Sequence, residues 1–306
     1  MNILLTGSHG FIGSALIDIL KERGDHVARL VRGPSRPSSP DPAWDPVAYQ
    51  IDENRLEGFD GVIHLAGESL VARRWTPAQK TRIRDSRING TRLLAGALGR
   101  LSRPPRVLLS ASAVGYYGDR GDEILREESP PGTGFLAELC QQWEAATEPA
   151  RRAGIRVVHL RTGLVLSSTG GVLARILPIF RLGLGGPLGS GRQYMSWVAI
   201  DDVCAAVLHL LANTTAAGPV NLVAPHPVTN REFTAALGLA LSRPTRFAVP
   251  AAVLRVVFGE MADEALLASA RAEPAQLRAS GYSFRFPDLS GVFFALFGGE
   301  GRRRVM

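Results

Sequence analysis

Cysteine is scarce in this sequence of 306 residues. Cys140 and Cys204 are the two cysteines, and each lies far from the other in a segment with a helical pattern. A disulfide framework needs several cysteines at short, regular spacings. The sequence therefore predicts two buried thiols rather than a disulfide or a redox pair, and it favours a reducing, cytoplasmic location.

Long apolar runs are also missing, although 45% of the residues are hydrophobic. A membrane-spanning helix needs about 20 consecutive apolar residues. The longest candidate, residues 247–258, is interrupted by Pro250 and Arg255. The N-terminus enters a strand pattern at once, without the basic and apolar regions of a signal peptide. We expect neither a membrane span nor a membrane partner.

Lysine is as rare as cysteine, because Lys21 and Lys80 are the two lysines among 35 basic residues. The formal net charge is +7, and the arginines are spread along predicted helices. Grooves that bind single-stranded nucleic acid interleave their basic residues with aromatic ones, and this pattern does not. We therefore expect no nucleic-acid partner. The six histidines show no spacing typical of metal ligands, so we also expect no metal site.

Short apolar runs alternate with longer helical patterns over the first two hundred residues. Runs that are apolar throughout are typical of parallel strands covered on both faces. Their alternation with helices indicates βαβ units. The sequence predicts an α/β fold with a Rossmann-type doubly wound parallel sheet. The strand candidates are residues 2–6, 26–31, 61–65, 106–110 and 156–160, and the helix candidates are residues 10–23, 77–98, 135–153 and 202–212.

The pattern changes after residue 223, where helical segments follow one another: 230–241, 251–258, 262–270 and 274–279. We expect a nucleotide-binding domain formed by residues 1–165 and 195–228. Residues 166–194 and 229–306 should form a substrate-side lid and a smaller, mainly helical C-terminal subdomain. Residues 33–46 are rich in proline, serine and aspartate, and they predict a surface loop. Asp201 and Asp202 precede a helix, which favours a capping role.

A glycine-rich segment, residues 6–13, follows the first strand and opens the first helix. Its glycines allow a tight turn, a close approach of backbone to pyrophosphate, and close packing of helix on strand. The N–H groups at the helix N-terminus favour an anion. Strand, loop and amphipathic helix all fall in the expected order. The segment therefore predicts a dinucleotide site rather than a simple turn.

The second strand indicates which dinucleotide binds. An NAD site usually places a carboxylate at the end of this strand, near the ribose 2′-hydroxyl. Arg32 stands there instead, and a guanidinium can pair with a 2′-phosphate. We favour NADP over NAD, with a solvated loop arginine as the alternative reading. Leu65, Ala66 and Gly67 close the third major strand, where small residues let the backbone approach the ribose and nicotinamide.

Taken together, these features resemble the extended short-chain dehydrogenase/reductase superfamily. The chain is most similar to an atypical subgroup, the NAD-dependent epimerase/dehydratase-like family with a C-terminal domain of unknown function. The resemblance covers nearly the whole chain. It rests on residues 6–13, 64–68, 85–87, 110–118, 127–131, 161–163, 180–187, 191–197 and 259–262. The residues expected to contact the cofactor are Thr6, Gly7, Ser8, His9, Gly10, Phe11, Ile12, Gly13, Arg32, Leu65, Ala66, Gly67, Ser110 and Arg161.

The resemblance implies an active site of serine, tyrosine, a lysine four residues later, and a helix asparagine. Ser112 matches the serine, and we expect its hydroxyl to face the nicotinamide. Leu136 and Cys140 fall near the tyrosine and lysine positions, and Arg87 takes the place of the asparagine. With only two lysines, both outside this helix, no alignment gives the tyrosine–lysine pair. Standard hydride transfer is therefore in doubt.

Three other residues are candidates for the missing acid or base. Tyr116 and Tyr117 follow Ser112 at the carboxyl end of a strand, and Glu68 follows the cofactor-contacting strand. Each also has a structural interpretation, as a packed tyrosine or a hydrogen-bonded loop carboxylate. Without the lysine, a phenol serves better as an acid in reduction than as a base in oxidation.

The substrate is expected on the side of Arg192, Gln193 and Trp197, where Arg192 suits an anionic group or a salt bridge. Two functions remain open. The chain is an NADP-dependent oxidoreductase or epimerase that acts on an unidentified small molecule, or it is a non-catalytic NADP(H)-binding sensor or interaction protein. The resemblance also implies a homodimer that pairs through the helices at 77–98 and 135–153.

Overall fold

The computed structural model describes residues 1–33, 39 and 41–302, with side chains up to residue 298. Its contacts divide the chain into two compact units. Unit 1 comprises Met1–Ser112, Leu139–Leu160 and Cys204–Val220, and unit 2 comprises Ala113–Glu138, Arg161–Val203 and Asn221–Met306. The functional division expected from the sequence, with its boundaries at residues 165, 195 and 228, stays a prediction.

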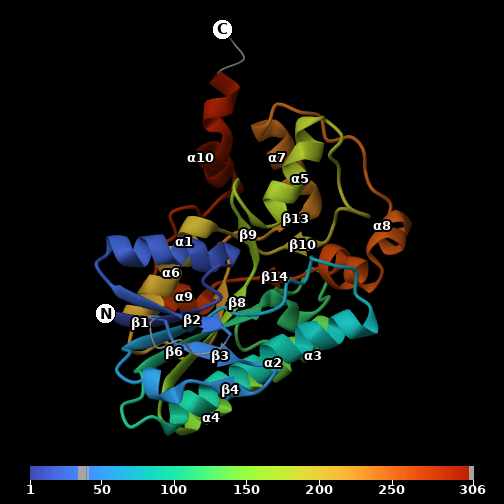
Figure 1. The fold of residues 1–306 in the computed structure, drawn as a ribbon. Helices are drawn as coiled ribbons and strands as arrows, with labels where there is room; N and C mark the ends of the chain where they lie inside the picture. Colours follow the sequence, from blue (N-terminus) through green and yellow to red (C-terminus); the bar gives the residue numbers. More distant parts are fainter. Residues whose placement is uncertain (34–38, 40, 303–306) are drawn as a thin grey trace. The chain divides into compact units, whose positions relative to one another are not determined.

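An eight-stranded sheet has the strand order β12-β8-β6-β5-β1-β2-β3-β4 (Figure 1). Its four adjacent strands β6, β5, β1 and β2 pair in parallel. This arrangement confirms the predicted Rossmann-type α/β fold. The strands are β1 (Asn2–Thr6), β2 (His26–Arg32), β3 (Ala43–Asp45), β4 (Gln50–Ile51), β5 (Gly61–His64), β6 (Val107–Ala113), β8 (Arg156–Thr162) and β12 (Gly218–Leu222).

Helices cover both faces of this sheet, α1 and α6 on one side and α2, α3 and α4 on the other (Figure 1). Leu94 and Leu98 of α2 pack in one core cluster with Leu4 and Val62 of the strands. The predicted helix at 135–153 is divided into α3 and α4, because Pro149 lacks an N–H group. The helices are α1 (Phe11–Glu22), α2 (Pro77–Arg100), α3 (Phe135–Ala145), α4 (Glu148–Arg152) and α6 (Ile200–Ala212).

The loop predicted at residues 33–46 is wrong in its second part. Residues 43–45 form β3, which pairs in parallel with β2, and β4 returns antiparallel to it. Trp44 is 2% exposed and belongs to the same core cluster as Leu4. Burial of this one aromatic side chain fixes a strand within a segment of turn-forming composition. Residues 34–38 and 40 of the predicted loop lie outside the described residues.

Unit 2 is held by three two-stranded sheets and several helices. Trp197, Phe233, Phe293 and Phe297 fill its main core cluster. The sheets pair β9 (Leu164–Leu166) with β11 (Trp197–Ala199), β10 (Tyr194–Met195) with β13 (Val228–Thr229), and β7 (Ile124–Leu125) with β14 (Arg271–Ala272). The α-helices of unit 2 are α5 (Gly171–Arg181), α7 (Asn230–Ala240), α8 (Ala251–Phe258), α9 (Ala275–Ala279) and α10 (Leu289–Arg302). Unit 2 also contains the π-helix η3 (Ala262–Leu267) and the 3-10 helix η2 (Val114–Tyr117). A further 3-10 helix, η1 (Glu53–Arg55), lies in unit 1.

The sequence predicted buried cysteines and no membrane span. Cys140 and Cys204 are both buried, as predicted. Within residues 1–33, 39 and 41–302, no helix has both the length and the apolarity needed to cross a membrane.

The capping role expected for Asp202 is wrong. Its buried carboxylate accepts hydrogen bonds from the backbone N–H groups of Arg285, at 2.8 Å, and Phe286, at 2.9 Å. The Tyr282 hydroxyl donates to the same carboxylate at 2.9 Å. These donors lie 80 or more residues away in the sequence. Asp202 therefore fixes the segment that leads into α10, a helix that the sequence did not predict.

We expect Asp202→Asn to lower the free energy of unfolding by about 1 to 3 kcal/mol, because an amide cannot accept all three bonds and would leave a buried donor unsatisfied. Asp201→Asn is the matched control, since Asp201 is exposed and forms a surface ion pair with Arg285. Its effect should stay below about 0.5 kcal/mol. Chemical denaturation measures both, and equal losses would contradict the role given to Asp202.

Candidate functional site

The glycine-rich loop joins β1 to α1 in unit 1. Gly7 has φ +70°, and a Cβ atom there would lie 2.7 Å from the carbonyl carbon of Leu65. A Cβ atom at Gly13 would collide with the carbonyl oxygen of Gly7. The Gly10 N–H donates to the same oxygen at 2.9 Å. The loop conformation therefore requires glycine at positions 7 and 13, as the sequence predicted.

The N-terminus of α1 is open to an anion. Gly10 is the N-cap, and no side chain caps the helix. His9 and Gly10 are exposed, and Phe11 and Ile12 are half-buried. The free N–H groups of the first turn and the helix dipole favour negative charge there. The glycine cradle and the uncapped helix end fit the pyrophosphate of a dinucleotide.

Thr6 connects this loop to the segment after β5. Its hydroxyl oxygen accepts the N–H groups of Leu65 and Ala66, both at 3.1 Å. The residues expected to approach the cofactor, 6–13 and 65–67, therefore lie side by side in unit 1. Gly67 is exposed, and a Cβ atom there would lie 3.2 Å from the guanidinium carbon of Arg87.

His64 extends the Thr6 contact into the core. The Thr6 hydroxyl has used both acceptor positions on backbone N–H groups, so it donates its own proton to Nδ1 of His64 at 2.7 Å. The ring proton therefore lies on Nε2, which donates to the Thr91 hydroxyl at 2.9 Å. Trp143 Nε1 donates to the same hydroxyl at 3.0 Å. Burial lowers the pKa of His64 to about 4, so the ring is neutral.

Arg87, predicted at the asparagine position, is a buried cation. It is 8% exposed, donates to the carbonyl oxygen of Glu68 at 2.8 Å, and lies 5.0 Å from the ring centroid of Trp143. Burial lowers the pKa of Arg87 to about 10. The side chain is therefore charged at neutral pH, and it contacts the backbone of Gly67 and Glu68.

Glu68 is held at three points. Its N–H donates to the Ser86 hydroxyl at 3.0 Å, its carbonyl oxygen accepts from Arg87, and its carboxylate lies 3.4 Å from Nε2 of Gln79. The side chain is half-buried. Glu68 thus remains a candidate proton carrier, and the same contacts are consistent with the structural interpretation.

Ser112 differs from the expectation in its orientation. Its hydroxyl, predicted to face the nicotinamide, donates to Oε1 of Glu144 at 2.7 Å, and the side chain is 4% exposed. A substrate oxygen must compete with that carboxylate for the proton.

Ser110 is 1% exposed, and its hydroxyl has no hydrogen-bond partner in the part of the chain that the structure describes.

The two tyrosine candidates in unit 2 have different environments. Tyr117 is fully buried, and its hydroxyl donates to Oδ1 of Asn221 at 2.7 Å. Burial raises its pKa to about 12. A catalytic role for Tyr117 is therefore wrong, since its hydroxyl is inaccessible and already bonded. Tyr116 is half-buried. It stays a candidate.

Arg161 was expected to contact the cofactor, and the position of its side chain corrects this expectation. It is 3% exposed, and its guanidinium carbon lies 3.5 Å from the ring centroid of Tyr116. The same guanidinium donates to the Tyr117 hydroxyl and to the Glu127 carbonyl oxygen, both at 3.1 Å. Arg161 is therefore a buried support of both tyrosines in unit 2.

The three residues expected to bind the substrate have different environments in unit 2. Trp197 is fully buried in the core of unit 2 and donates to the carbonyl oxygen of His226 at 3.0 Å. Gln193 is 7% exposed, and its amide donates to the carbonyl oxygens of Leu188 and Leu266, both at 3.1 Å. Both expectations are wrong, because these polar groups bind backbone. Arg192 is exposed and stays a candidate.

Arg32 ends β2, as predicted, and its side chain is exposed. Among the described residues its guanidinium has no hydrogen-bond or ion-pair partner.

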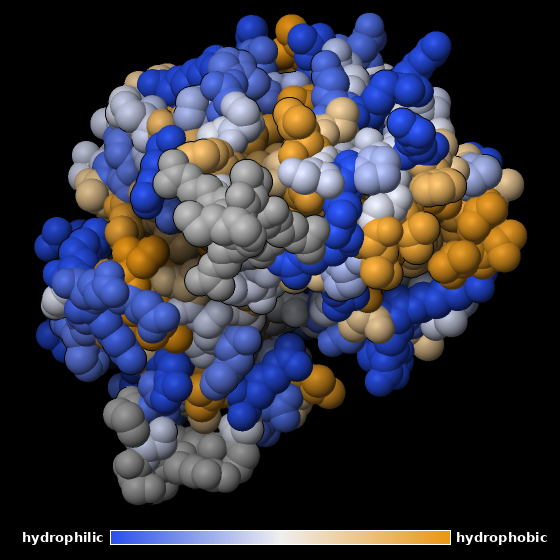
Figure 2. Space-filling view, turned by 90° about the horizontal axis from the view of Figure 1, so that it is seen from above, coloured by the Kyte–Doolittle hydropathy of each residue, from blue (hydrophilic) through white to orange (hydrophobic). Residues whose placement is uncertain are grey.

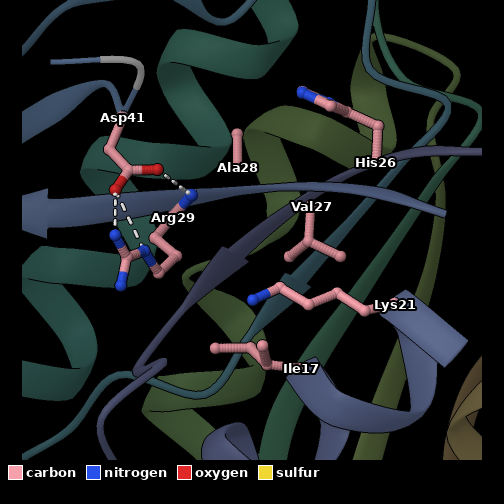
Figure 3. A pocket seen from close by; sticks show the side chains of 7 residues that line it. All are labelled: Ile17, Lys21, His26, Val27, Ala28, Arg29 and Asp41. Atoms are coloured by element: carbon pink, nitrogen blue, oxygen red, sulfur yellow. Dashed lines mark hydrogen bonds and ion pairs between the residues drawn. The ribbon is translucent and has the colours of Figure 1, made fainter.

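A separate hollow lies beside the same strand, nearer its beginning, and is lined by Lys21 and Arg29 (Figure 3). There Asp41 binds both the N–H and the side chain of Arg29, each at 2.9 Å. This hollow is distinct from the glycine-rich loop.

Sequence reasoning missed His64, Thr91 and Trp143 as supports of the site. His64 was considered as a metal ligand and as part of the family motif at 64–68, not as a buried support, and Thr91 and Trp143 lie inside helical patterns that gave no separate signal. The one available signal was a histidine at the end of an otherwise apolar strand, since buried polar groups need partners.

Fold and loop together define an atypical extended short-chain dehydrogenase/reductase. The sequence profile of the NAD dependent epimerase/dehydratase family matches residues 3–223, and a domain of unknown function, DUF1731, matches residues 249–293. The chain belongs to this epimerase/dehydratase family.

Three relatives illustrate the match. Epimerase family protein Mb2239 of Mycobacterium bovis is 45% identical over 282 residues, which cover 92% of this chain and 93% of that protein. The crystal structure of human epimerase family protein SDR39U1 (isoform 2) with NADPH has a TM-score of 0.89, with 34% identity, and the match covers 97% of this chain and 99% of that one. A nucleoside-diphosphate sugar epimerase from Corynebacterium glutamicum has a TM-score of 0.80 and 36% identity, covering 98% of this chain and 58% of the other.

The depressed pKa of His64 predicts a pH dependence of stability. Between pH 6.5 and about 4 the unfolded chain binds a proton at this residue and the folded chain does not. The stabilisation is complete above pH 6.5 and is lost as pH falls through this window, by up to about 3 kcal/mol. We expect His64→Asn, which does not titrate, to show a shallower decline in unfolding free energy over this range. Parallel curves for the two proteins would contradict the assignment.

Proposed function

We propose that this protein binds NADP(H) and acts as an oxidoreductase or epimerase-like enzyme on an unidentified small molecule. The observation that carries the proposal is the glycine cradle at Gly7 and Gly13, followed by an uncapped helix end. NADPH in the structure of human SDR39U1 supports this choice of cofactor. The cofactor, when bound, supplies or accepts the hydride.

The chain's own residues have separate roles in this proposal. The backbone at residues 7–13 binds pyrophosphate, and Arg32 pairs with the 2′-phosphate. Residues 65–67, fixed by Thr6 and Arg87, line the ribose side. Ser112 offers a hydroxyl to the substrate, and Tyr116 or Glu68 moves a proton. Arg192 suits an anionic group of the substrate.

A second candidate function is a non-catalytic NADP(H)-binding protein. It is favoured by the engagement of Ser112 with Glu144 and by the burial of Tyr117, which leave fewer groups for proton transfer. Cofactor binding without turnover across a broad substrate screen would select this function.

Arg32→Ala tests the choice of NADP. Loss of a charge-assisted contact to the 2′-phosphate should weaken NADPH binding by about 10- to 100-fold and leave NADH binding within about twofold. Arg103→Ala is the control, because Arg103 is another exposed arginine of unit 1, with 79% of its side chain exposed. Fluorescence titration measures both cofactors. Equal losses for NADPH and NADH, or none, would refute the NADP assignment.

The proton carrier is tested by tyrosine variants in any reductive turnover of NADPH that a metabolite screen finds. General acid catalysis contributes about 100- to 10,000-fold, so Tyr116→Phe should lower kcat by at least about 100-fold. Tyr117→Phe should lower the melting temperature, since it removes a buried hydroxyl with three partners. Ser112→Ala should also lower kcat. Full activity of both Tyr116→Phe and Ser112→Ala would reject these roles, and Glu68→Gln would then be tested in the same assay.

A further inference from the structure

Unit 2 exposes a group of large apolar side chains at the end of α5, at the end of α7 and along α8. We call this group the α8 surface. Their exposed fractions range from 48% for Val253 to 83% for Leu239. In Figure 2, apolar residues gather at the right edge over the region of α8, with hydrophilic residues along their border. The members are Ile179, Leu182, Leu184, Leu239, Phe247, Val253, Val256 and Val257.

Hydrogen bonds to backbone groups join the segments that carry this surface. Arg243 donates from Nε to the carbonyl oxygen of Arg181 at 2.7 Å, which joins the end of α5 to the segment after α7. The Val249 N–H donates to the carbonyl oxygen of Pro187 at 2.8 Å, and the Gly189 N–H donates back to Val249. Residues 182–189 therefore lie against residues 243–249, which lead directly into α8.

Helix α8 is unusual for an exposed helix. Of its eight residues, Arg255 is the one charged residue, and Leu254 is the one buried residue. Val253, Val256 and Val257 face solvent, and valine has no favourable helix propensity to explain its presence there. Contiguous exposed apolar surface of this kind usually marks an interaction site.

Within the two segments that supply this surface, every charged residue is an arginine. Residues 162–200 and 233–259, which supply all eight apolar side chains, contain no aspartate or glutamate, although the whole chain has 28 acidic residues. The same two segments contain six arginines. Arg255 is paired with Asp263 at 2.9 Å. The six are Arg175, Arg181, Arg192, Arg243, Arg246 and Arg255.

We propose that the α8 surface binds the headgroup region of an anionic lipid membrane. Protruding aliphatic side chains with an arginine border are typical of helices that lie in the membrane interface. Arginine can bury its stem there while its charge meets lipid phosphate. A second copy of the chain would instead bring the arginines of these two segments close to one another. The proposal replaces the sequence-based expectation of no membrane partner, and it involves no membrane-spanning segment.

Vesicle sedimentation tests the proposal with the full chain. We expect binding to vesicles of phosphatidylcholine with 30% phosphatidylglycerol to exceed binding to phosphatidylcholine alone by about tenfold or more, and to fall at 0.5 M salt. Val256→Asp should reduce binding by about tenfold. Val47→Asp is the matched control, because Val47 is an exposed valine of unit 1, at 96%, and should leave binding unchanged.

The charge is tested separately. Arg246→Gln should weaken binding to the anionic vesicles by about fivefold, and Arg103→Gln in unit 1 should have no effect. NADPH affinity and melting temperature of Val256→Asp should match those of the unmodified protein, which shows that the variant is folded and that the result is independent of the cofactor proposal. Absence of anionic-vesicle binding, or equal losses in Val256→Asp and Val47→Asp, would overturn the proposal. So would a dimer in light scattering that Val256→Asp dissociates, because the surface would then be a contact between copies.

Discussion

The Thr6 hydroxyl is the contact on which the nucleotide site depends. It accepts the N–H groups of Leu65 and Ala66 and donates to His64, so one oxygen joins the end of β1 to the segment after β5. That junction brings the backbone at Leu65 so close to Gly7 that a side chain at position 7 has no space. The glycine requirement at position 7 therefore follows from this junction, whereas the neutral state of His64 follows from its burial.

Arg87 shows what a buried cation does where the family resemblance implies an asparagine. An arginine stays charged, and its planar guanidinium is fixed by directional bonds. Here it binds the Glu68 carbonyl oxygen and lies over Trp143, which itself donates to Thr91. The positive charge of Arg87 is therefore fixed beside the backbone of Gly67 and Glu68. It cannot act as a proton donor in the physiological range.

The sequence allowed the fold and the nucleotide loop to be predicted because both depend on local signals. Glycine spacing fixes the loop, and uniformly apolar runs identify parallel strands. Trp197 and Tyr117 could not be placed in this way. Each carries a polar group whose burial depends on a partner distant in sequence, the His226 carbonyl oxygen for one and Asn221 for the other. Strand β3 and the anchoring of α10 by Asp202 were missed for the same reason.

Glu127 is the centre of a buried polar network in unit 2. Its carboxylate accepts the N–H groups of Asn221 and Gln276, both at 3.0 Å, and its second oxygen is buried without a partner among residues 41–302. Burial raises the pKa of Glu127. Asn221 in turn holds Tyr117, and Arg161 holds both Tyr117 and the Glu127 backbone. Four polar residues are thus joined in one buried network, and the half-buried ring of Tyr116 stacks on its Arg161 guanidinium.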